Sequence, residues 1–265
     1  MRTLVIGLDS ATWSIMTPLI EQGRLPNLGR LMDSGVSGTL HSTVPPMTPS
    51  AWTSIATGVN PGKHGIYDFV AQDRETYHIT PVNYSQLRRP AIWDIFNSYE
   101  KKVGIVNFPL AFPPPEVDSF FISGISSPQT GSFAYPAHLM NLLRESNYEI
   151  YPPSGLRRDA RLYMDGVKRL TDIQVGVTLR LMRQEPWDLM LAVFMGADWV
   201  QHYLWNKEIN GTSAIHDFYQ YIDVKLGEML SEAEDDWNIM VLSDHGAREI
   251  EGEIHLNRLL EEWGQ

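Results

Sequence analysis

Four apolar runs, separated by segments with a helical pattern, constrain the fold of this chain more than any other feature of its sequence. Apolar residues follow one another in these runs instead of alternating with polar ones, which is typical of parallel strands buried on both faces. Ala160–Gln184 is a long amphipathic segment and the clearest of the intervening helices. The pattern predicts a three-layer α/β sandwich, with helices on both faces of a largely parallel central sheet. The four predicted strands are Thr3–Leu8, Val103–Asn107, Asp188–Phe194 and Trp237–Leu242.

The segment 108–159 interrupts this alternation. It contains eight prolines, and proline-rich stretches are typical of loops. We expect a loop region or an inserted cap over the carboxyl edge of the sheet, with one strand at Phe120–Ser123. Residues 68–83 are polar and are predicted to be irregular, whereas Leu25–Met32 and Ile92–Phe96 are predicted helices.

The composition excludes several kinds of partner and chemistry. With 21 basic and 32 acidic residues the net charge is −11, which argues against a nucleic-acid-binding surface and against a polybasic membrane anchor. The chain has no cysteine, so disulfides and cysteine-bound zinc are excluded and any metal must be bound by histidine and carboxylates. The first apolar run, Leu4–Leu8, is too short for a signal peptide or a membrane span. We therefore expect a cytoplasmic protein.

Acidic residues and histidines follow three of the predicted strands directly. Asp9 follows the first, and an acid there lies at the carboxyl edge of the sheet, where open α/β sheets bind their ligands; alternatively it caps a helix. Asp198 and His202 follow the third strand, and their spacing of four residues places both on one face of a helix, where they can bind a single ion. Asp244 and His245 follow the fourth strand and can both reach one metal from a loop.

Thr48 lies between two prolines, just before a run of small and apolar residues that ends in Thr57-Gly58. This pattern places Thr48 at or just before a helix N-terminus, where unpaired N–H groups and the helix dipole favour a bound phosphoryl group. Two roles are open for it, a nucleophile or a simple helix cap. His64 is flanked by glycines, and we interpret it as a residue that holds a tight turn, in preference to a metal ligand.

Together, these residues indicate a two-metal phosphoryl-transfer site. In this set of motifs the chain resembles the alkaline phosphatase superfamily. More narrowly, it is similar to the type I phosphodiesterase/nucleotide pyrophosphatase family and its microbial relatives described as phosphohydrolases or phosphomutases. The similarity extends over essentially the whole chain, and the ordered set of motifs is specific although single motifs are not. The matching motifs are Gly7-Leu8-Asp9, Thr48 with Thr57-Gly58, Pro61-Gly62-Lys63-His64-Gly65-Ile66, Asp198-x-x-x-His202 and Ser243-Asp244-His245-Gly246.

The resemblance implies an alkaline phosphatase-like catalytic domain over residues 1–265, with residues 108–159 as its cap or insertion. It also implies two divalent metal ions, usually zinc, with manganese as the alternative. A phosphothreonine intermediate at Thr48 is part of the implied mechanism. The implied ligands are Asp9, Asp244, His245 and the Thr48 oxygen for one ion, and Asp198 with His202 for the other.

Two departures from the family pattern affect the expected site. Family enzymes complete the second metal site with a histidine from a Gly-x-His motif near their C-terminus, and this chain has none after Asp244-His245, so we expect the C-terminal part of the domain to be missing. His255 is the histidine that could replace it. The nucleotide pyrophosphatases also place an asparagine three residues after the nucleophile to hold a phosphoryl oxygen, where this chain has Ala51.

The expected activity is metal-dependent hydrolysis of a phosphodiester or nucleotide pyrophosphate-type bond in a small-molecule phosphate ester or nucleotide. One alternative is a phosphomonoesterase or phosphomutase of the same superfamily. Another is a truncated metal-binding module with impaired catalysis. A sulfatase is excluded because no Cys/Ser-x-Pro-x-Arg motif surrounds Thr48. The oligomeric state is left open.

Overall fold

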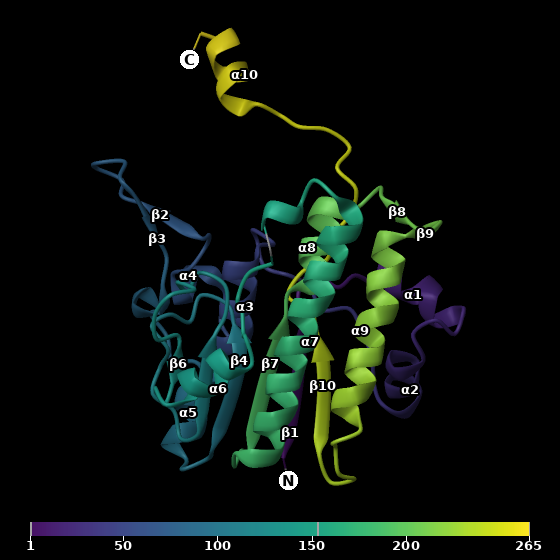
Figure 1. The fold of residues 1–265 in the computed structure, drawn as a ribbon. Helices are drawn as coiled ribbons and strands as arrows, with labels where there is room; N and C mark the ends of the chain where they lie inside the picture. Colours follow the sequence, from purple (N-terminus) through teal and green to yellow (C-terminus); the bar gives the residue numbers. More distant parts are fainter. Residues whose placement is uncertain (1, 153, 265) are drawn as a thin grey trace.

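A six-stranded sheet forms the centre of the computed structural model, which describes residues 2–152 and 154–264 (Figure 1). Five of its strands are parallel and the outermost one, β6, is antiparallel. This mixed but mostly parallel sheet confirms the predicted fold class. In spatial order the strands are β10 (Asn238–Leu242), β1 (Thr3–Leu8), β7 (Leu189–Phe194), β4 (Val103–Phe108), β5 (Phe120–Ser123) and β6 (Ala134–Tyr135).

The predicted strands are confirmed with small shifts at their ends. β7 and β10 each begin one residue later than predicted, and β4 continues through Phe108. β1, β4, β5 and β7 are almost entirely buried, as expected for strands covered on both faces. β10, at the edge of the sheet, is only partly buried.

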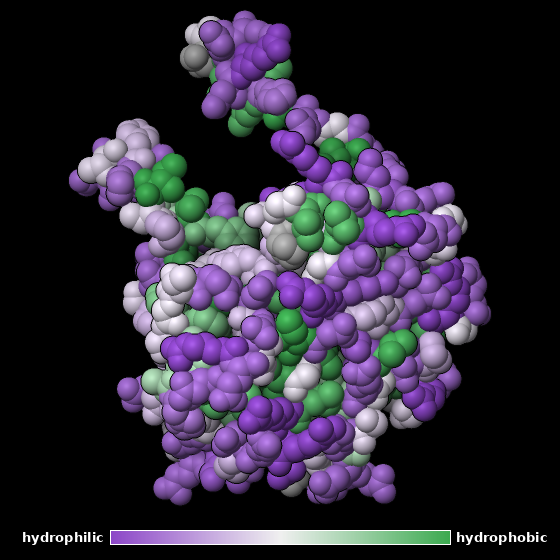
Figure 2. All heavy atoms as spheres, in the orientation of Figure 1, coloured by the Kyte–Doolittle hydropathy of each residue, from purple (hydrophilic) through white to green (hydrophobic). Residues whose placement is uncertain are grey.

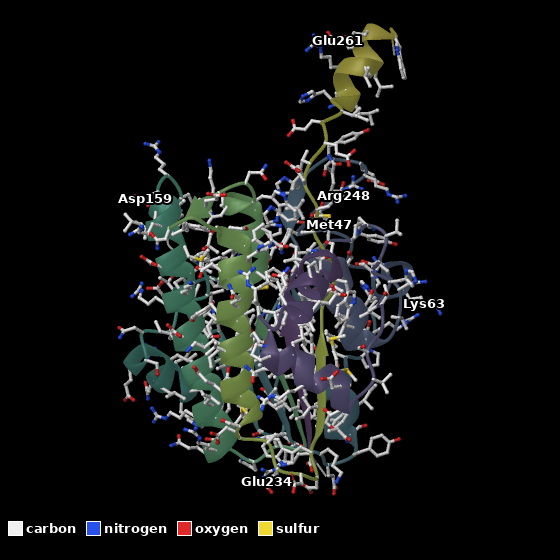
Figure 3. All side chains as sticks on the ribbon, turned by 90° about the vertical axis from the view of Figure 1, so that its right-hand side faces the viewer. Met47, Lys63, Asp159, Glu234, Arg248 and Glu261 are labelled. Carbon is white, nitrogen blue, oxygen red and sulfur yellow. The ribbon has the colours of Figure 1, made fainter. Side chains whose placement is uncertain are left out.

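Helices cover both faces of the sheet. α1, α2, α7, α8 and α9 pack together, with α7 against β7 and β4, whereas α3 and α5 lie together with α5 against β4. Figure 3 shows the two layers in profile, with Asp159 at the start of α7 on one side and Lys63 of α4 on the other. The helices are α1 (Trp13–Glu21), α2 (Pro26–Ser34), α3 (Thr48–Thr57), α4 (Pro61–His64), α5 (Ile92–Ser98), α6 (Leu139–Glu145), α7 (Ala160–Gln184), α8 (Gly196–Leu204), α9 (Ala214–Leu230) and α10 (Leu256–Glu262).

Close packing between β1 and α3 fixes the position of that helix. The ring of Trp52 lies against the backbone of Gly7, where a Cβ atom would come within 2.3 Å of the indole. Trp52 also contacts Phe108 edge to face, and Phe108 contacts Trp93 of α5 in the same way. The small residue in β1 therefore lets a large aromatic side chain approach the middle of the sheet.

Two regions differ from the sequence predictions. Residues 68–83, predicted to be irregular, form a hairpin of β2 (Val70–Gln72) and β3 (Ile79–Pro81) followed by a 3₁₀ turn at Tyr84–Gln86. Both strands of this hairpin are exposed, so the sequence shows no apolar periodicity that would predict them. The hairpin projects from the carboxyl end of the sheet, and its apolar residues are visible in Figure 2.

The segment 108–159 contributes more regular structure than the predicted single strand. β5 and β6 extend the central sheet, and α6 packs against β6. A 3₁₀ turn at Ser154–Leu156 leads towards α7. A role for this segment as a cap over a substrate stays a prediction.

The remaining elements lie on the periphery. β8 (Glu208–Ile209) and β9 (Thr212–Ser213) form a short hairpin before α9. α10 lies beyond the end of the sheet on an extended connection (Figure 1). No helix in the described part of the chain has the length and apolar character needed to cross a membrane.

Candidate active site

Register in the parallel sheet brings the three predicted strand ends to one edge. Gly7 of β1 pairs with Leu242 of β10, and Leu8 pairs with Phe194 of β7. The residues that follow these positions therefore emerge side by side at the carboxyl edge. In this way the sheet brings Asp9 near acidic residues and histidines that follow it by more than 180 positions in the sequence.

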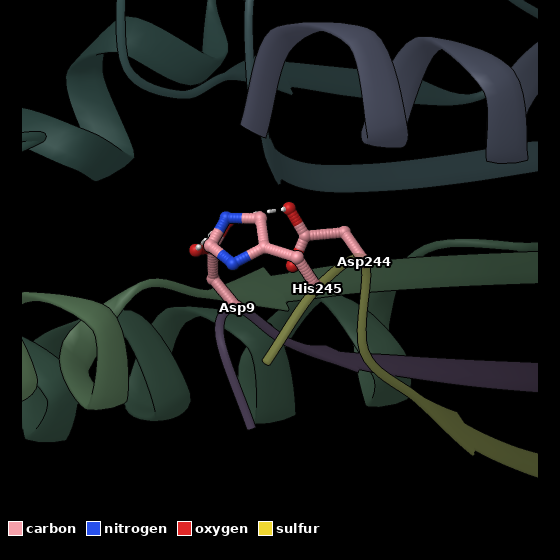
Figure 4. Close-up of side chains that lie close together, drawn as sticks. All are labelled: Asp9, Asp244 and His245. Atoms are coloured by element: carbon pink, nitrogen blue, oxygen red, sulfur yellow. Dashed lines mark ion pairs between the residues drawn. The ribbon is translucent and has the colours of Figure 1, made fainter. Parts of the chain in front are cut away.

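Asp9, Asp244 and His245 form the centre of the site. One ligand atom from each side chain lies within 4.8 Å of the others. His245 Nε2 is 3.4 Å from Asp244 Oδ2 and 3.7 Å from Asp9 Oδ1, and Figure 4 shows the imidazole ring between the two carboxylates. Three of the four predicted ligands of the first ion therefore lie close together.

Asp9 is fully buried and held from one side only. Its Oδ2 accepts a 2.6 Å hydrogen bond from the indole N–H of Trp52, whereas Oδ1 has no hydrogen-bond partner in the described part of the chain. Burial, followed by the charges of Asp244 and Asp198, holds the pKa of Asp9 well above its usual range. The first helix after Asp9 has Thr12 as its N-cap, so Asp9 does not cap a helix.

Asp244 repeats this one-sided arrangement. Its Oδ1 accepts a hydrogen bond from the backbone N–H of Ser10 at 3.2 Å, and its Oδ2 has no hydrogen-bond partner among the described residues. Burial raises the pKa of Asp244 to about 6. Each carboxylate thus has one oxygen fixed by the protein and one directed towards His245.

The hydrogen bonds of His245 determine which ring nitrogen faces the site. Nδ1 is 3.0 Å from the carbonyl oxygen of Gly246 and can only donate to it. Nε2 is then unprotonated in the neutral ring, and it is the atom that faces both carboxylates. A backbone contact on the far nitrogen is the usual way in which proteins orient a metal-binding imidazole.

Thr48 is the first residue of α3, and its Oγ1 lies 3.2 Å from His245 Nε2. The N-cap of α3 is Met47, so the alternative role of Thr48 as the cap is wrong. The first bond of the helix ladder runs from Ala51 N–H to Met47 O, which leaves the amides of Thr48 and Ser50 ahead of the ladder. Pro49 has no N–H and supplies no donor at this end.

Asp198 and His202 lie on one face of α8, as the spacing predicts. His202 Nε2 is 3.4 Å from Asp198 Oδ1, and the hydrogen bond to Asp198 raises the pKa of His202. Both residues line a cavity of about 620 Å³ together with Thr48 and His245. In the described structure the pair offers two ligands and lies beside the central cluster without joining it.

The other candidate residues lie outside this cluster. His64 is the buried last residue of α4, where it contacts Ser54 and accepts from the Ile66 N–H of the following turn, so its interpretation as a residue that holds the turn is confirmed. Ala51 is buried and lines a different cavity from Thr48. His255 is exposed just before α10, where its Nε2 lies 3.9 Å from Glu253 Oε2, and it does not join the ligand cluster of Asp9, Asp244 and His245.

Three residues that support the site could not be recognised in the sequence. The indole N–H of Trp52 donates a hydrogen bond to Asp9, and the backbone N–H of Ser10 donates one to Asp244. Gln201 Nε2 in turn donates to the Ser10 carbonyl at 2.9 Å. Ser10 has φ of 62°, a left-handed conformation in which its N–H can reach Asp244. The only sequence signal is Gly7 two residues before Asp9, which permits the close approach of Trp52.

The donor set fits a divalent cation such as zinc. Two buried carboxylate oxygens without hydrogen-bond partners and an unprotonated imidazole nitrogen face one another across a few ångströms. Unpaired buried carboxylates are costly, and a cation between them would remove that cost. The residues present therefore suit the metal that the resemblance implies.

Comparison with solved structures defines the fold first. Phosphonoacetate hydrolase from Sinorhizobium meliloti 1021, in complex with phosphonoacetate, matches with a TM-score of 0.68 at 22% identity, over 99% of this chain and 62% of that one. Murine ectonucleotide pyrophosphatase/phosphodiesterase 5 matches with a TM-score of 0.56 at 15% identity, over 93% of this chain and 57% of the other. An inactive threonine-to-alanine variant of that murine protein, in complex with AMP, matches with a TM-score of 0.54 at 16% identity, over the same shares of the two chains. The fold is alkaline phosphatase-like, and the chain spans less than two thirds of these proteins.

Sequence comparison then gives the family. Residues 3–265 match the type I phosphodiesterase / nucleotide pyrophosphatase family, and the chain belongs to this hydrolase family of the alkaline phosphatase superfamily. No curated protein matched the chain. The family is the one that the ordered motifs predict.

Proposed function

We propose that this chain is a metal-dependent phosphohydrolase that cleaves a phosphodiester or nucleotide pyrophosphate-type bond through a phosphothreonine intermediate at Thr48. One observation carries the proposal. Thr48 Oγ1 contacts the same nitrogen of His245 that faces the free oxygens of Asp9 and Asp244. A hydroxyl, two carboxylates and an imidazole thus lie close together, and Thr48 and His245 line a cavity large enough for a small phosphate ester.

The chain's own residues account for nucleophile placement and orientation. Thr48 Oγ1 would form a bond to phosphorus while the bond to the leaving oxygen breaks, and water would then cleave the Thr48 Oγ1–phosphorus bond and restore the hydroxyl. The amides of Thr48 and Ser50, ahead of the α3 ladder, could donate to a phosphoryl group bound at Thr48. Trp52 and Ser10 hold Asp9 and Asp244 in place during both steps.

Asp9, Asp244 and His245 would hold one cation, and Asp198 with His202 a second. Bound at these residues, divalent cations would lower the pKa of the Thr48 hydroxyl and stabilise the negative charge of the transferring phosphoryl group. Zinc fits the histidine and carboxylate donors, and manganese is the alternative. A cytoplasmic location remains a prediction.

One comparison supports the choice of nucleophile and of ester class. The murine pyrophosphatase/phosphodiesterase was captured with AMP as an inactive threonine-to-alanine variant. This result belongs to that protein, and it supports a threonine nucleophile and a nucleotide-type ester as the first choices here. A phosphomonoesterase or phosphomutase remains the alternative within the superfamily.

A second candidate function rests on the unequal metal sites. Only two ligands, Asp198 and His202, are brought together beside the central cluster in the described structure. A site with two protein ligands binds an ion weakly. A metal-binding module with impaired catalysis is therefore the competing function.

Hydrolysis of bis-p-nitrophenyl phosphate and of p-nitrophenyl phosphate, with and without Zn²⁺ or Mn²⁺, tests these functions. We expect metal-dependent turnover that Thr48→Ala lowers by about a thousandfold or more, because no other hydroxyl contacts His245 Nε2 in the described structure. Thr53→Ala, the same change on the same helix, should retain turnover. A Thr48→Ala variant as active as the parent would refute the nucleophile, and inactivity with every metal would favour the impaired module.

A further inference from the structure

A second cavity opens beside the candidate active site. Its volume is about 440 Å³, and it shares His202 with the larger cavity that contains Thr48. Aromatic side chains form most of its wall, and Arg157 is its cationic residue. His202 lines both cavities, so the second space lies next to the one that contains Thr48.

Aromatic packing holds Arg157 in position. Its guanidinium lies 4.3 Å from the centre of the Tyr203 ring, a cation–π distance. Tyr203 is itself packed edge to face against Tyr163, with ring centres 5.3 Å apart. Tyr163 is fully buried, and the Arg157 guanidinium lies near its hydroxyl. The Arg157 head group therefore rests on the pair of rings formed by Tyr203 and Tyr163 at the cavity wall.

Arg157 also carries a charge that no acidic side chain neutralises. Within the described residues, no salt bridge involves Arg157, whereas Arg248, which lines the larger cavity, is paired with Glu251. The surroundings are otherwise acidic, with Asp198 one helical turn before His202. An unpaired guanidinium beside an acidic site is suited to bind an anion that belongs to the ligand.

We propose that this cavity binds a second oxyanion, a carboxylate or a phosphate, of the ester whose phosphoryl group reacts at Thr48, and that Arg157 recognises it. The inference rests on the proposed function and narrows its substrate class to esters with an additional anionic group. Arg157 acts as a specificity residue, because its planar fork of N–H donors matches the two oxygens of a carboxylate or phosphate.

The same residues argue against a stacked nucleobase in this cavity. One face of the Tyr203 ring is already covered by Arg157 and its edge region is packed on Tyr163. The Tyr151 hydroxyl accepts from the Ser126 N–H and donates to the Ser127 carbonyl, which fixes this ring as a wall. The cavity therefore offers a charge to its ligand more readily than an open aromatic face.

Calorimetric binding to the zinc-loaded protein, using the whole chain, tests the proposal without turnover. The probes are propylphosphonate, 3-phosphonopropionate and propane-1,3-bisphosphonate, which share the phosphonate and differ in the far group. We expect the carboxylate or the second phosphonate to raise affinity about tenfold or more over propylphosphonate, as expected for a charge-assisted hydrogen bond. The larger gain identifies the preferred oxyanion.

Two neighbouring variants provide the control. Arg157→Gln should bring the three affinities to within about twofold of one another, whereas Arg158→Gln, which removes the same charge from the next exposed position, should preserve the gain. Equal affinities in the parent protein, or a gain that survives Arg157→Gln, would overturn the subsite alone. Failure of all three probes to bind the parent protein would instead overturn the phosphoryl site of the proposed function, and the subsite with it.

Discussion

At the residue scale, the site depends on side chains that leave one oxygen of each carboxylate free. Trp52 fixes Asp9 Oδ2 and the Ser10 N–H fixes Asp244 Oδ1, so the opposite oxygens face His245. The Nδ1 contact of His245 with the Gly246 carbonyl gives the ring the tautomer that a ligand needs. The geometry is therefore prepared by neighbours that would not themselves touch a cation.

Replacing Trp52 tests this preparation directly. Trp52→Phe removes the N–H that holds Asp9, and we expect zinc affinity to fall by about 10- to 100-fold. Trp93→Phe is the matched control, since Trp93 is another buried tryptophan of the same core whose N–H bonds Tyr84, away from the site. Both variants should lose about 1–2 kcal/mol of unfolding free energy, measured in urea. Equal zinc affinities in the two variants would contradict the positioning role of Trp52.

At the scale of elements, the packing of β1 against α3 connects the sheet to the nucleophile. Helix α3 carries Thr48 at its start and Trp52 on its second turn, and Trp52 fits only because position 7 has no side chain. Asp9 lies at the end of the same strand. One contact between a strand and a helix therefore positions both the nucleophile and a ligand.

A methyl group at Gly7 should disturb this contact. In Gly7→Ala the new Cβ would come within 2.3 Å of the Trp52 ring, and we expect a loss of about 1–3 kcal/mol in stability together with weaker zinc binding. Gly104→Ala places a Cβ 2.2 Å from the Phe120 ring, in the same sheet but away from the site. This control should be destabilised by a similar amount in thermal unfolding yet bind zinc like the parent. Unchanged zinc affinity in Gly7→Ala would show that the β1–α3 contact does not set the ligand position.

The turn after α4 predicts a pH dependence of stability. His64 accepts from the Ile66 N–H at Nδ1, so its Nε2–H donates to Ser54, and a second proton would break the first bond. Burial lowers the pKa of His64. The unfolded chain therefore binds the proton more readily, and the contribution of His64 to stability is present above about pH 6.5 and is lost as the pH falls below it.

Chemical unfolding of the metal-free protein between pH 5 and 7.5 measures this contribution. His64→Gln should lose less stability on acidification than the parent, whereas His41→Gln, at an exposed histidine, should keep the parental slope. All three proteins contain Asp9 and Asp244, so the titration of these carboxylates contributes equally to each and cancels in the comparison. If the unfolding free energy of His64→Gln changed with pH as steeply as that of the parent, His64 would not be the source of this pH dependence.

The sequence predicts those parts of the fold that repeat a pattern. Buried strands and the long α7 helix are recognisable because burial requires apolar residues at each strand position or along one helix face. Asp198 and His202 could be paired because helical spacing fixes their distance. The hairpin of β2 and β3 escaped prediction because its residues are exposed and carry no periodic signal.

Support within the site was less predictable, because it depends on contacts between distant segments. Trp52 resembles any core tryptophan, and only the fold brings its N–H to Asp9, 43 positions away. Arg157 lies in a polar turn that gives no sequence indication of the Tyr203 ring beneath it. His255 matched the residue type of a missing ligand, but the structure leaves it exposed near α10.

At the scale of the whole molecule, the two halves of the site differ in their number of ligands. The carboxyl edge of the sheet provides Asp9, Asp244 and His245, whereas α8 provides only Asp198 and His202. The chain carries a net charge of −11, so bound cations also offset the field that an anionic ester would meet. The two sites should therefore bind metal with unequal strength.

Zinc titration by calorimetry, with elemental analysis of the dialysed protein, measures this difference. We expect one ion to remain bound after dialysis and a second to bind at least about tenfold more weakly, because its site has fewer protein ligands. Asp244→Asn should remove the tight ion, and His202→Ala only the weak one. A tight ion lost in His202→Ala and kept in Asp244→Asn would contradict the assignment of the sites.

The central claim is that Thr48 becomes covalently phosphorylated, and trapping the intermediate tests it most directly. Zinc-loaded protein would be mixed with bis-p-nitrophenyl phosphate, quenched in acid within the first turnover, and digested for mass spectrometry. We expect a nitrophenylphosphoryl group on Thr48 in the parent protein, and no such adduct in Thr48→Ala. Turnover without an adduct at Thr48, or an adduct on another residue that persists in Thr48→Ala, would contradict it.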